Sequence, residues 1–247
     1  LPHRALWYNN LVMSKMVEAR PESSYLHAAP MFHAADLMNL MPVTVKGGHH
    51  TFLSAFDPAA VLQLLRDEAV NVTLLVPTMV NMVVNHPEAS AFGDLACKVI
   101  YGASPMPRPV IEQAMQLWGR EKFWQYYGQT ECPLTIAVLR PEDHEGALLG
   151  ACGRPSLDVE IRLVDEAGQD VPAGEPGEML VRGPSVVSSY LGDDEETARC
   201  FQDGWYHTSD LVSRAEDGFI DFVGRKSEML KIGGIRVYPL EIEKVLK

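Results

Sequence analysis

The sequence lacks the features of a disulfide-stabilised secreted protein and of a membrane protein. Its four cysteines, Cys97, Cys132, Cys152 and Cys200, are widely spaced and include no CxxC pair, so we expect four free thiols. No apolar run is long enough to span a bilayer, and no charged-then-apolar leader stands at the amino end. We therefore expect a cytoplasmic protein without a transmembrane segment.

Basic residues are scarce as well. The chain has 33 acidic against 21 basic residues, a net charge of −12, which opposes attraction to phosphate backbones. We expect no nucleic-acid partner. The 247 residues are 47% hydrophobic, enough to bury a core without disulfides. The chain opens at Leu1 and stops at Lys247 within a helical-looking segment, so we expect a piece of a longer protein.

Helical and strand patterns alternate in the first part of the chain. Asp57 and Pro58 suit an N-cap and a first helical position. The expected elements are a helix over 57–70, a strand over 71–77, a helix over 78–87, a strand over 98–104, a helix over 107–119 and a strand over 122–128. Short connections between them imply right-handed crossovers and a mainly parallel sheet, so we expect an α/β fold over residues 1–149.

From Gly150 onward the pattern changes to short alternating strands bounded by Gly, Pro and Asp. The turn sequence EDGF at 216–219 and an acidic helix start over 193–201 fall in this part. These features predict a β-rich, barrel-like subdomain over residues 150–226. The last segment, 227–247, predicts a strand pair around Gly233 and Gly234 and then a helix that opens at Pro239.

Four short motifs carry the chemistry: YGAS at 101–104, YYGQTE at 126–131, YHTSD at 206–210 and GRKSEMLKIGGIRVYPLEIE at 224–243. Each is weak alone, but their order resembles that of the adenylate-forming superfamily, which includes acyl-CoA synthetases and aryl-CoA ligases. The resemblance covers essentially the whole chain. It implies an AMP-forming acid–thiol ligase that uses ATP, Mg²⁺ and CoA: a carboxylic acid becomes an acyl-AMP and then a thioester. It also implies that residues 1–149 belong to a large AMP-binding domain and that 227–247 begin a small carboxyl-terminal one.

The motif YYGQTE ends a strand with a glycine, which lets a ligand approach the backbone at the sheet's carboxyl edge. By resemblance, the Thr130 hydroxyl contacts an ATP phosphate and Glu131 supports Mg²⁺, an ion that one carboxylate can share with phosphates and waters. Taken alone, Glu131 is equally an acidic residue beside a turn.

The resemblance also assigns the nucleotide contacts. The adenine would lie on Gly102, Ala103 and Ser104. The wall beside it would comprise Gln125, Tyr126, Tyr127, Gly128, Gln129 and Thr130.

Asp210 would accept the two ribose hydroxyls, and Arg225 would bond ribose or phosphate oxygens. The family usually has a glycine where Ser209 stands, and an Asp or Lys hinge residue where Ser227 stands. Gly233, Gly234 and Ile235 would lie beside the path of the CoA thiol, although two glycines fit an ordinary hairpin equally well.

His33 lies in PMFHAADL, which resembles the segment whose histidine gates the acyl pocket. Without the motif it would be interpreted as a hydrogen-bonded core residue. We expect the pocket to be lined near His33, Tyr101 and 132–136, whose apolar character favours an aliphatic or aryl acid. His49 and His50 are interpreted as a surface pair without a third metal ligand.

Two anchors of the family's adenylation step are absent: the Ser/Thr/Gly-rich phosphate loop and the lysine near the carboxyl terminus. We therefore expect this fragment alone to have little or no adenylating activity. Two other hypotheses stay open for the parent protein. One is a peptide-synthetase adenylation domain, in which an aspartate such as Asp36 would bind a substrate ammonium. The other is a non-catalytic, nucleotide-binding module. The sequence predicts no oligomeric state.

Overall fold

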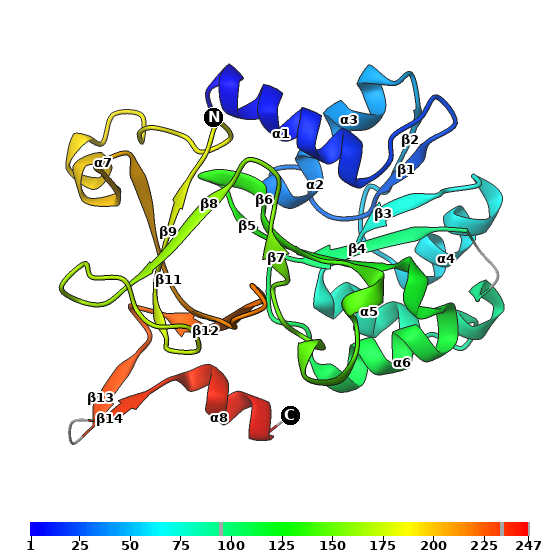
Figure 1. Ribbon diagram of the computed structural model, residues 1–247. Coiled ribbons are helices and arrows are strands. Elements are labelled where there is room, and N and C mark those ends of the chain that lie inside the picture. The colour runs from blue at the N-terminus through cyan, green and yellow to red at the C-terminus, as the bar shows by residue number, and fades with distance from the viewer. Residues whose placement is uncertain (94–95, 233–234, 247) are drawn as a thin grey trace.

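The computed structural model describes residues 1–93, 96–232 and 235–246. Within these residues the strands form a seven-stranded mixed sheet, a five-stranded antiparallel sheet and a short two-stranded ribbon (Figure 1). The mixed sheet lies between two groups of helices, and the antiparallel sheet lies beside it. This arrangement confirms the expected α/β fold with a β-rich second part.

The mixed sheet has the strand order β2-β1-β3-β4-β5-β6-β7. Its first five strands run parallel, while β6 and β7 are antiparallel to their neighbours. The strands are β1 (Ser24–His27), β2 (His49–Phe52), β3 (Val72–Leu74), β4 (Lys98–Gly102), β5 (Phe123–Gln129), β6 (Cys132–Leu139) and β7 (Arg154–Pro155). The mainly parallel sheet is thus confirmed, with an antiparallel edge that the sequence patterns did not predict.

Helices cover both faces of this sheet. One face carries α1 (His3–Met16), α2 (Ala34–Leu37) and α3 (Leu40–Val45). The other carries α4 (Pro58–Asp67), α5 (Pro77–Val84) and α6 (Arg108–Trp118). Short 3₁₀ helices lie at Ala89–Phe92, Arg120–Lys122, Pro141–Asp143 and Gly146–Leu148.

The expected helices begin and end close to their predicted signals. Asp57 is the N-cap of α4, with Pro58 at its first turn, and the apolar residues Val61, Leu62 and Leu65 face the sheet. Helix α6 ends at Gly119, whose φ of +91° suits glycine. Local sequence therefore determines this α/β layer well.

The antiparallel sheet has the order β10-β11-β9-β8, and β12 pairs with β11. Its strands are β8 (Glu160–Val164), β9 (Gly177–Arg182), β10 (Phe201–Gln202), β11 (Trp205–Arg214) and β12 (Ile220–Arg225). Helix α7 (Asp194–Cys200) precedes β10 and has three acidic residues in its first turn, which confirms the predicted acidic helix start. The Asp193 carboxylate caps it by accepting a hydrogen bond from the Glu196 backbone N–H. The predicted turn at 216–219 joins β11 to β12, with Gly218 at φ +89°.

The final described segment comprises β13 (Leu230–Ile232), β14 (Ile235–Val237) and α8 (Pro239–Leu246). The two strands pair antiparallel, as predicted, while Gly233 and Gly234 lie outside the described residues. Tyr238 is buried, and its ring faces Gly224 of β12. Among the residues described, no helix has both the length and the apolar character needed to cross a bilayer.

Candidate active site

Two parallel strands end side by side at the carboxyl edge of the mixed sheet. Gly102 of β4 pairs with Tyr126 of β5, and a Cβ at Gly102 would lie 2.0 Å from the Tyr126 carbonyl oxygen. Glycine is therefore required here by the approach of the two strands. Ala103, at φ +66°, and Ser104 follow as exposed residues. The edge where open α/β sheets bind ligands is thus formed by small side chains.

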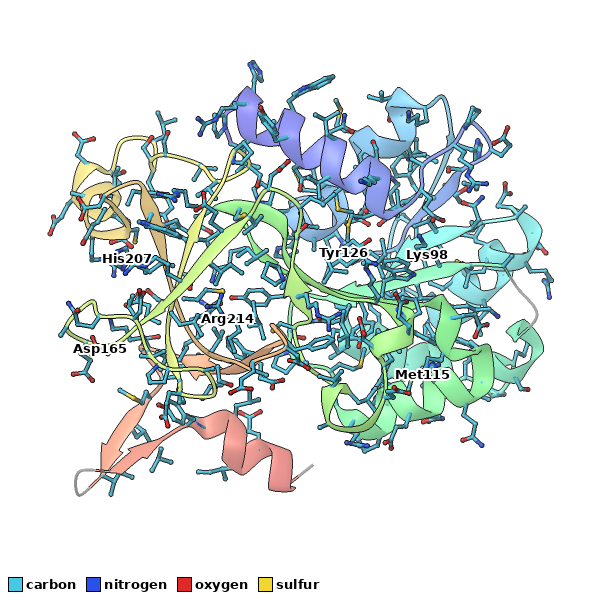
Figure 2. The ribbon with its side chains drawn as sticks, in the orientation of Figure 1. Lys98, Met115, Tyr126, Asp165, His207 and Arg214 are labelled. Carbon is cyan, nitrogen blue, oxygen red and sulfur yellow. The ribbon has the colours of Figure 1, made fainter. Side chains whose placement is uncertain are left out.

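The side chains of β5 alternate between different surroundings. The Gln125 amide faces the backbone carbonyls of Ala151 and Cys152 and donates to them when its nitrogen is assigned to that side. Tyr126 is buried in the core between the sheet and α1 (Figure 2). Tyr127 points the other way and donates a hydrogen bond to Asp210. Of these three predicted wall residues, Tyr127 is the one joined to another predicted nucleotide contact.

Thr130 and Glu131 form the turn between β5 and β6. The register of the two strands shifts between Tyr127 and Gln129, so Gly128 lies at a bulge that directs the turn. Thr130 is exposed, as its predicted contact with a phosphate requires. The Glu131 carboxylate accepts a 2.8 Å hydrogen bond from the Tyr190 hydroxyl at Oε1; its Oε2 receives none from the residues that the structure describes.

Asp210 lies in β11 of the antiparallel sheet, at the centre of a buried polar cluster. It is 2% exposed, and its Oδ2 accepts hydrogen bonds from the Tyr127 hydroxyl and from Gln129 Nε2, the latter at 2.7 Å. Its Oδ1 is buried without a hydrogen bond. Burial raises the pKa of this carboxyl above its usual range, and the bonds from Tyr127 and the charge of Arg225 partly offset the rise.

Arg225 pairs directly with Asp210 across the antiparallel strands β11 and β12. Its Nε lies 3.4 Å from Asp210 Oδ1, while the side chain stays 56% exposed. The guanidinium therefore has donors left for a ligand. The predicted partners Asp210 and Arg225 are brought together by strand register.

Ser209 adopts φ +59°, the left-handed region that favours glycine. It sits where the pairing of β11 with β9 is interrupted between His207 and Leu211, and its carbonyl accepts a hydrogen bond from the Lys226 backbone N–H. The backbone conformation gives a physical reason for glycine at this position. Ser227 follows Lys226 in the turn after β12.

His33 lies away from this cluster, as the N-cap residue of α2. Its ring is exposed and rests against the ring of Phe32, with centroids 4.5 Å apart. Helix α2 packs near β6, the strand that follows Glu131. The exposed position of His33 rules out the alternative interpretation of a hydrogen-bonded core residue.

One of the buried histidines is His27, which the sequence patterns did not single out. Its Nδ1 lies 2.7 Å from Asp36 Oδ2, and its Nε2 lies 3.0 Å from His50 Nδ1. Asp36 also accepts a 3.2 Å bond from the Tyr25 hydroxyl and is fully buried. The interpretation of His49 and His50 as a surface pair is therefore wrong for His50, although His49 is exposed.

The expected acyl-pocket lining is not supported at Tyr101, Cys132 and Ile136. The Tyr101 ring is fully buried, and its hydroxyl is 2.9 Å from His144 Nε2. Cys132 and Ile136 are fully buried in the core beneath the antiparallel sheet. These side chains lack exposed faces because β6 is an interior strand. Of the residues expected beside the thiol path, Gly233 and Gly234 lie outside the described residues, as does the side chain of Ile235.

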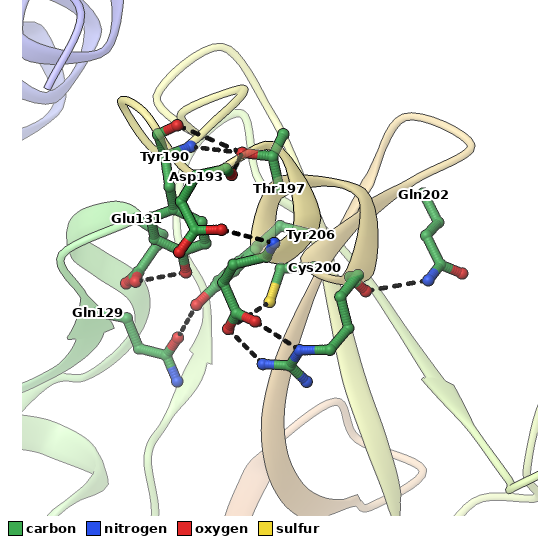
Figure 3. Close-up of polar contacts among 10 residues, drawn as sticks. Gln129, Glu131, Tyr190, Asp193, Thr197, Cys200, Gln202 and Tyr206 are labelled. Atoms are coloured by element: carbon green, nitrogen blue, oxygen red, sulfur yellow. Dashed lines mark hydrogen bonds and ion pairs between the residues drawn. The ribbon is translucent and has the colours of Figure 1, made fainter.

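Two tyrosines, Tyr190 and Tyr206, join the predicted residues into one network (Figure 3). Tyr190 donates to Glu131, and Tyr206 donates a 2.6 Å hydrogen bond to Gln129 Oε1. Gln129 in turn donates to Asp210. Sequence reasoning missed both tyrosines because their partners are 59 and 77 positions away along the chain.

Comparison with known proteins matches most of the chain to one family. The family model described as AMP-binding enzyme matches residues 1–191. The medium/long-chain-fatty-acid–CoA ligase FadD8 of Mycobacterium tuberculosis is 38% identical over 90% of this chain and 39% of its own length. A feruloyl-CoA synthase of Amycolatopsis is 35% identical over 100% of this chain and 50% of its own.

Solved structures show the same likeness. An O-succinylbenzoate CoA synthetase of Bacillus subtilis, in complex with ATP and magnesium, superposes with a TM-score of 0.89 at 27% identity, over 99% of this chain and 50% of that one. An amide bond synthetase of Marinactinospora thermotolerans gives 0.90 at 30% identity, over 98% and 50%. The chain spans about half the length, or less, of these relatives. Over the part that it spans, the chain belongs to the AMP-binding enzyme family.

Proposed function

We propose that the protein carrying this chain activates an apolar carboxylic acid with ATP and passes the acyl group to CoA. In the first step the carboxylate oxygen attacks the α-phosphorus of ATP, pyrophosphate leaves, and an acyl-AMP forms. In the second step the CoA thiol, giving up its proton, attacks the acyl carbonyl, and AMP leaves. Both steps depend on positioning and on neutralising charge on oxygen.

The observation that carries the proposal is the acceptor left open on Asp210. This buried carboxylate oxygen accepts no hydrogen bond from the described part of the chain, although Arg225 Nε forms an ion pair with it at 3.4 Å. Such an acceptor is costly unless a ligand supplies a donor. Ribose hydroxyls are such donors, and the exposed guanidinium of Arg225 beside it suits a phosphate or ribose oxygen. We assign nucleotide binding to this pair.

The turn after β5 would receive the phosphates. Thr130 has an exposed hydroxyl there, and Glu131 keeps one carboxylate oxygen without a hydrogen bond among the described residues. One carboxylate together with substrate phosphates and water is a usual ligand set for Mg²⁺, so the residues present fit this ion. When bound, Mg²⁺ would neutralise phosphate charge. The adenine would lie on the exposed strand end at Ala103 and Ser104.

The remaining predicted roles belong to the same proposal. His33 would gate the acid, and the segment at Gly233, Gly234 and Ile235 would lie along the thiol path. We also propose the division into an α/β part over 1–149, a β-rich part over 150–226, and a hinge with the start of a further domain over 227–247. The three sheets of the structure support such a division.

The nature of the acid follows from two observations. The relatives include ligases named for fatty, feruloyl and succinylbenzoate acids. In addition, Asp36, the aspartate that an amino-acid substrate would need, is fully buried and already bonded to His27 and Tyr25. Both support an aliphatic or aryl acid over an amino acid.

The test is acid-dependent exchange of labelled pyrophosphate into ATP by the protein carrying this chain, with aliphatic, aryl and amino acids in parallel. CoA is then added, and thioester is sought by mass spectrometry, with an amine as the competing acceptor. We expect exchange with an apolar acid and thioester with CoA. Exchange with amino acids alone would support an adenylation domain, and nucleotide binding without any exchange would support a non-catalytic module.

A further inference from the structure

The Glu131 carboxylate is held by a residue of the loop between β9 and α7. The Tyr190 hydroxyl donates to Glu131 Oε1 at 2.8 Å, an ordinary length for a hydrogen bond to a carboxylate. This bond fixes the rotation of the carboxylate and leaves Oε2 as the oxygen that can meet a cation.

Tyr190 is itself fixed by its neighbours. Its backbone N–H donates to Thr197 Oγ1 at 2.9 Å, and the Thr197 hydroxyl donates to the Asp193 carbonyl at 2.7 Å (Figure 3). Its ring packs edge-on against Phe201, with centroids 5.6 Å apart. The first turn of α7 therefore holds the tyrosine in place.

A second attachment joins the same loop to the site. The Glu131 carbonyl accepts a 2.8 Å hydrogen bond from the Val187 backbone N–H. The loop over 187–193 thus contacts both the backbone and the side chain of Glu131. Because the backbone bond survives any side-chain change at Tyr190, the hydroxyl can be tested with the loop still attached.

The neighbouring Tyr206 acts on a different group. Its hydroxyl donates to Gln129 Oε1 at 2.6 Å, which orients the amide so that Nε2 faces Asp210. Both tyrosine rings contact Phe201, whose ring stacks on Tyr206 with centroids 5.1 Å apart. One hydroxyl is thus directed to the proposed phosphate side of the site and the other to the ribose side.

We propose that Tyr190 is a positioning residue for magnesium: by occupying Glu131 Oε1, it presents Oε2 as a single ligand to the ion that accompanies ATP. This inference rests on the proposed function. Magnesium demands near-ideal octahedral geometry and takes few protein ligands, so one well-oriented oxygen suits it better than a carboxylate free to rotate. Outer groups that orient a metal ligand typically change metal affinity tenfold or more when removed.

The experiment measures ATP binding to the protein carrying this chain by isothermal titration calorimetry, across a range of Mg²⁺ concentrations and in EDTA. For Tyr190→Phe we expect the Mg²⁺ concentration that gives half of the maximal gain in ATP affinity to rise about tenfold. The affinity measured in EDTA should not change. Tyr206→Phe should instead weaken ATP binding by the same factor with and without Mg²⁺. Tyr8→Phe, on the outer face of α1, is the matched control and should match the wild type.

A double-mutant cycle separates positioning from a general loss of structure. In a Glu131→Gln background, Tyr190→Phe should have no further effect on the Mg²⁺ dependence, because the group on which it acts is gone. Thr197→Val, which loosens the Tyr190 backbone while keeping its hydroxyl, should raise the Mg²⁺ requirement by a smaller factor. Thermal unfolding of each variant, followed by circular dichroism, verifies that it is folded.

The outcomes distinguish the inference from the function on which it rests. If the wild type binds no ATP under any condition, the proposed function fails. If the wild type binds ATP with a Mg²⁺ dependence that Tyr190→Phe leaves unchanged, the inference alone is overturned. An effect of Tyr190→Phe that persists at full size in the Glu131→Gln background would overturn it as well.

Discussion

Asp36 and His27 are each other's principal partners inside the protein, with Oδ2 and Nδ1 2.7 Å apart and side chains 0% and 1% exposed. The pair ties α2, which begins at Ala34, to the end of β1. Because His33 is the N-cap of the same helix, the pair also fixes the position of the backbone that carries the proposed gate residue. In the protein interior, this contact replaces the hydrogen bonds to water that both side chains lose on folding.

Replacing Asp36 by alanine should destabilise the protein by about 3 kcal/mol, because a buried partner is left unpaired. The measurement is the midpoint of urea unfolding, which is converted into a free energy of unfolding with the same m-value for each variant. Asp67→Ala is the control, since Asp67 pairs with Arg66 on the surface, and its midpoint should not move. Equal midpoints for the two variants would contradict a structural role for the buried pair.

The two histidines of this region should respond in opposite ways. His33→Ala should leave the urea midpoint unchanged, because the ring is exposed, while raising the KM for the acid about tenfold, the size of one lost pocket contact. His27→Ala should instead lower stability by about 3 kcal/mol, since Asp36 then stays buried without its partner. Urea unfolding curves measure the stability of both variants, and acid-dependent pyrophosphate exchange measures their KM for the acid. A His33 variant with wild-type KM would remove the gate assignment.

The thiols should be inert in the folded protein. All four cysteines are buried and none forms a disulfide within the described residues, and burial raises the pKa of Cys97 to about 12 and that of Cys132 to about 11. The thiolate is the reactive form, so we expect almost no reaction with a disulfide reagent at about pH 8. In guanidinium chloride four thiols per chain should react. Rapid labelling of the native protein would contradict the buried positions.

How far the sequence predicts the structure depends on how local each feature is. Helices α4 and α6 were predicted from caps and apolar spacing, which neighbouring residues set. Helix α1 was not predicted, because its buried face includes Asn9 and Asn10 while Trp7 is exposed, which hides the apolar period. The expected pocket lining at 132–136 is not supported at Cys132 and Ile136, which are fully buried, because an apolar run is equally typical of a pocket and of an interior strand.

The candidate site likewise combines residues that the local sequence predicts with residues that it does not. Motifs identified Glu131, Asp210 and Arg225, and strand register then placed Asp210 opposite Arg225. Tyr190, which bonds Glu131 from 59 positions away, carried no local pattern. Hydrogen bonds of this kind depend on how two sheets pack, and single-sequence periodicity holds no information about that packing.

Ser209→Gly should stabilise the protein by about 1 kcal/mol, because a residue with a Cβ is strained at φ +59°. Ser213→Gly is the matched control: Ser213 lies in the same strand in regular pairing with Asp221, and glycine there should destabilise by roughly 0.5–1 kcal/mol. Urea unfolding of both variants measures whether each substitution raises or lowers the free energy of unfolding. A loss of stability in both would show that Ser209 makes a compensating contact.

Asp210→Asn tests whether the buried carboxyl that would bind the nucleotide also lowers the stability of the folded protein. Burial raises the pKa of this carboxyl above its ordinary value of 3.8, so the folded state holds the proton more tightly than the unfolded state does. The contribution of the protonated carboxyl to stability is therefore fully present below about pH 4 and is lost as pH rises through the folded pKa. We expect Asp210→Asn, which cannot ionise, to gain stability relative to the wild type as pH rises from about 4 to 7.

The measurement is a set of urea midpoints for the wild type and Asp210→Asn across that pH range. Glu216→Gln, at an exposed turn carboxyl, is the control and should show no such divergence. The same Asp210→Asn variant should bind ATP more weakly, because an amide presents one acceptor where the carboxylate presents two. Constant differences between the midpoints at all pH values would mean that Asp210 is solvated in solution. In that case the argument for a ribose site based on its unpartnered oxygen would lose its support.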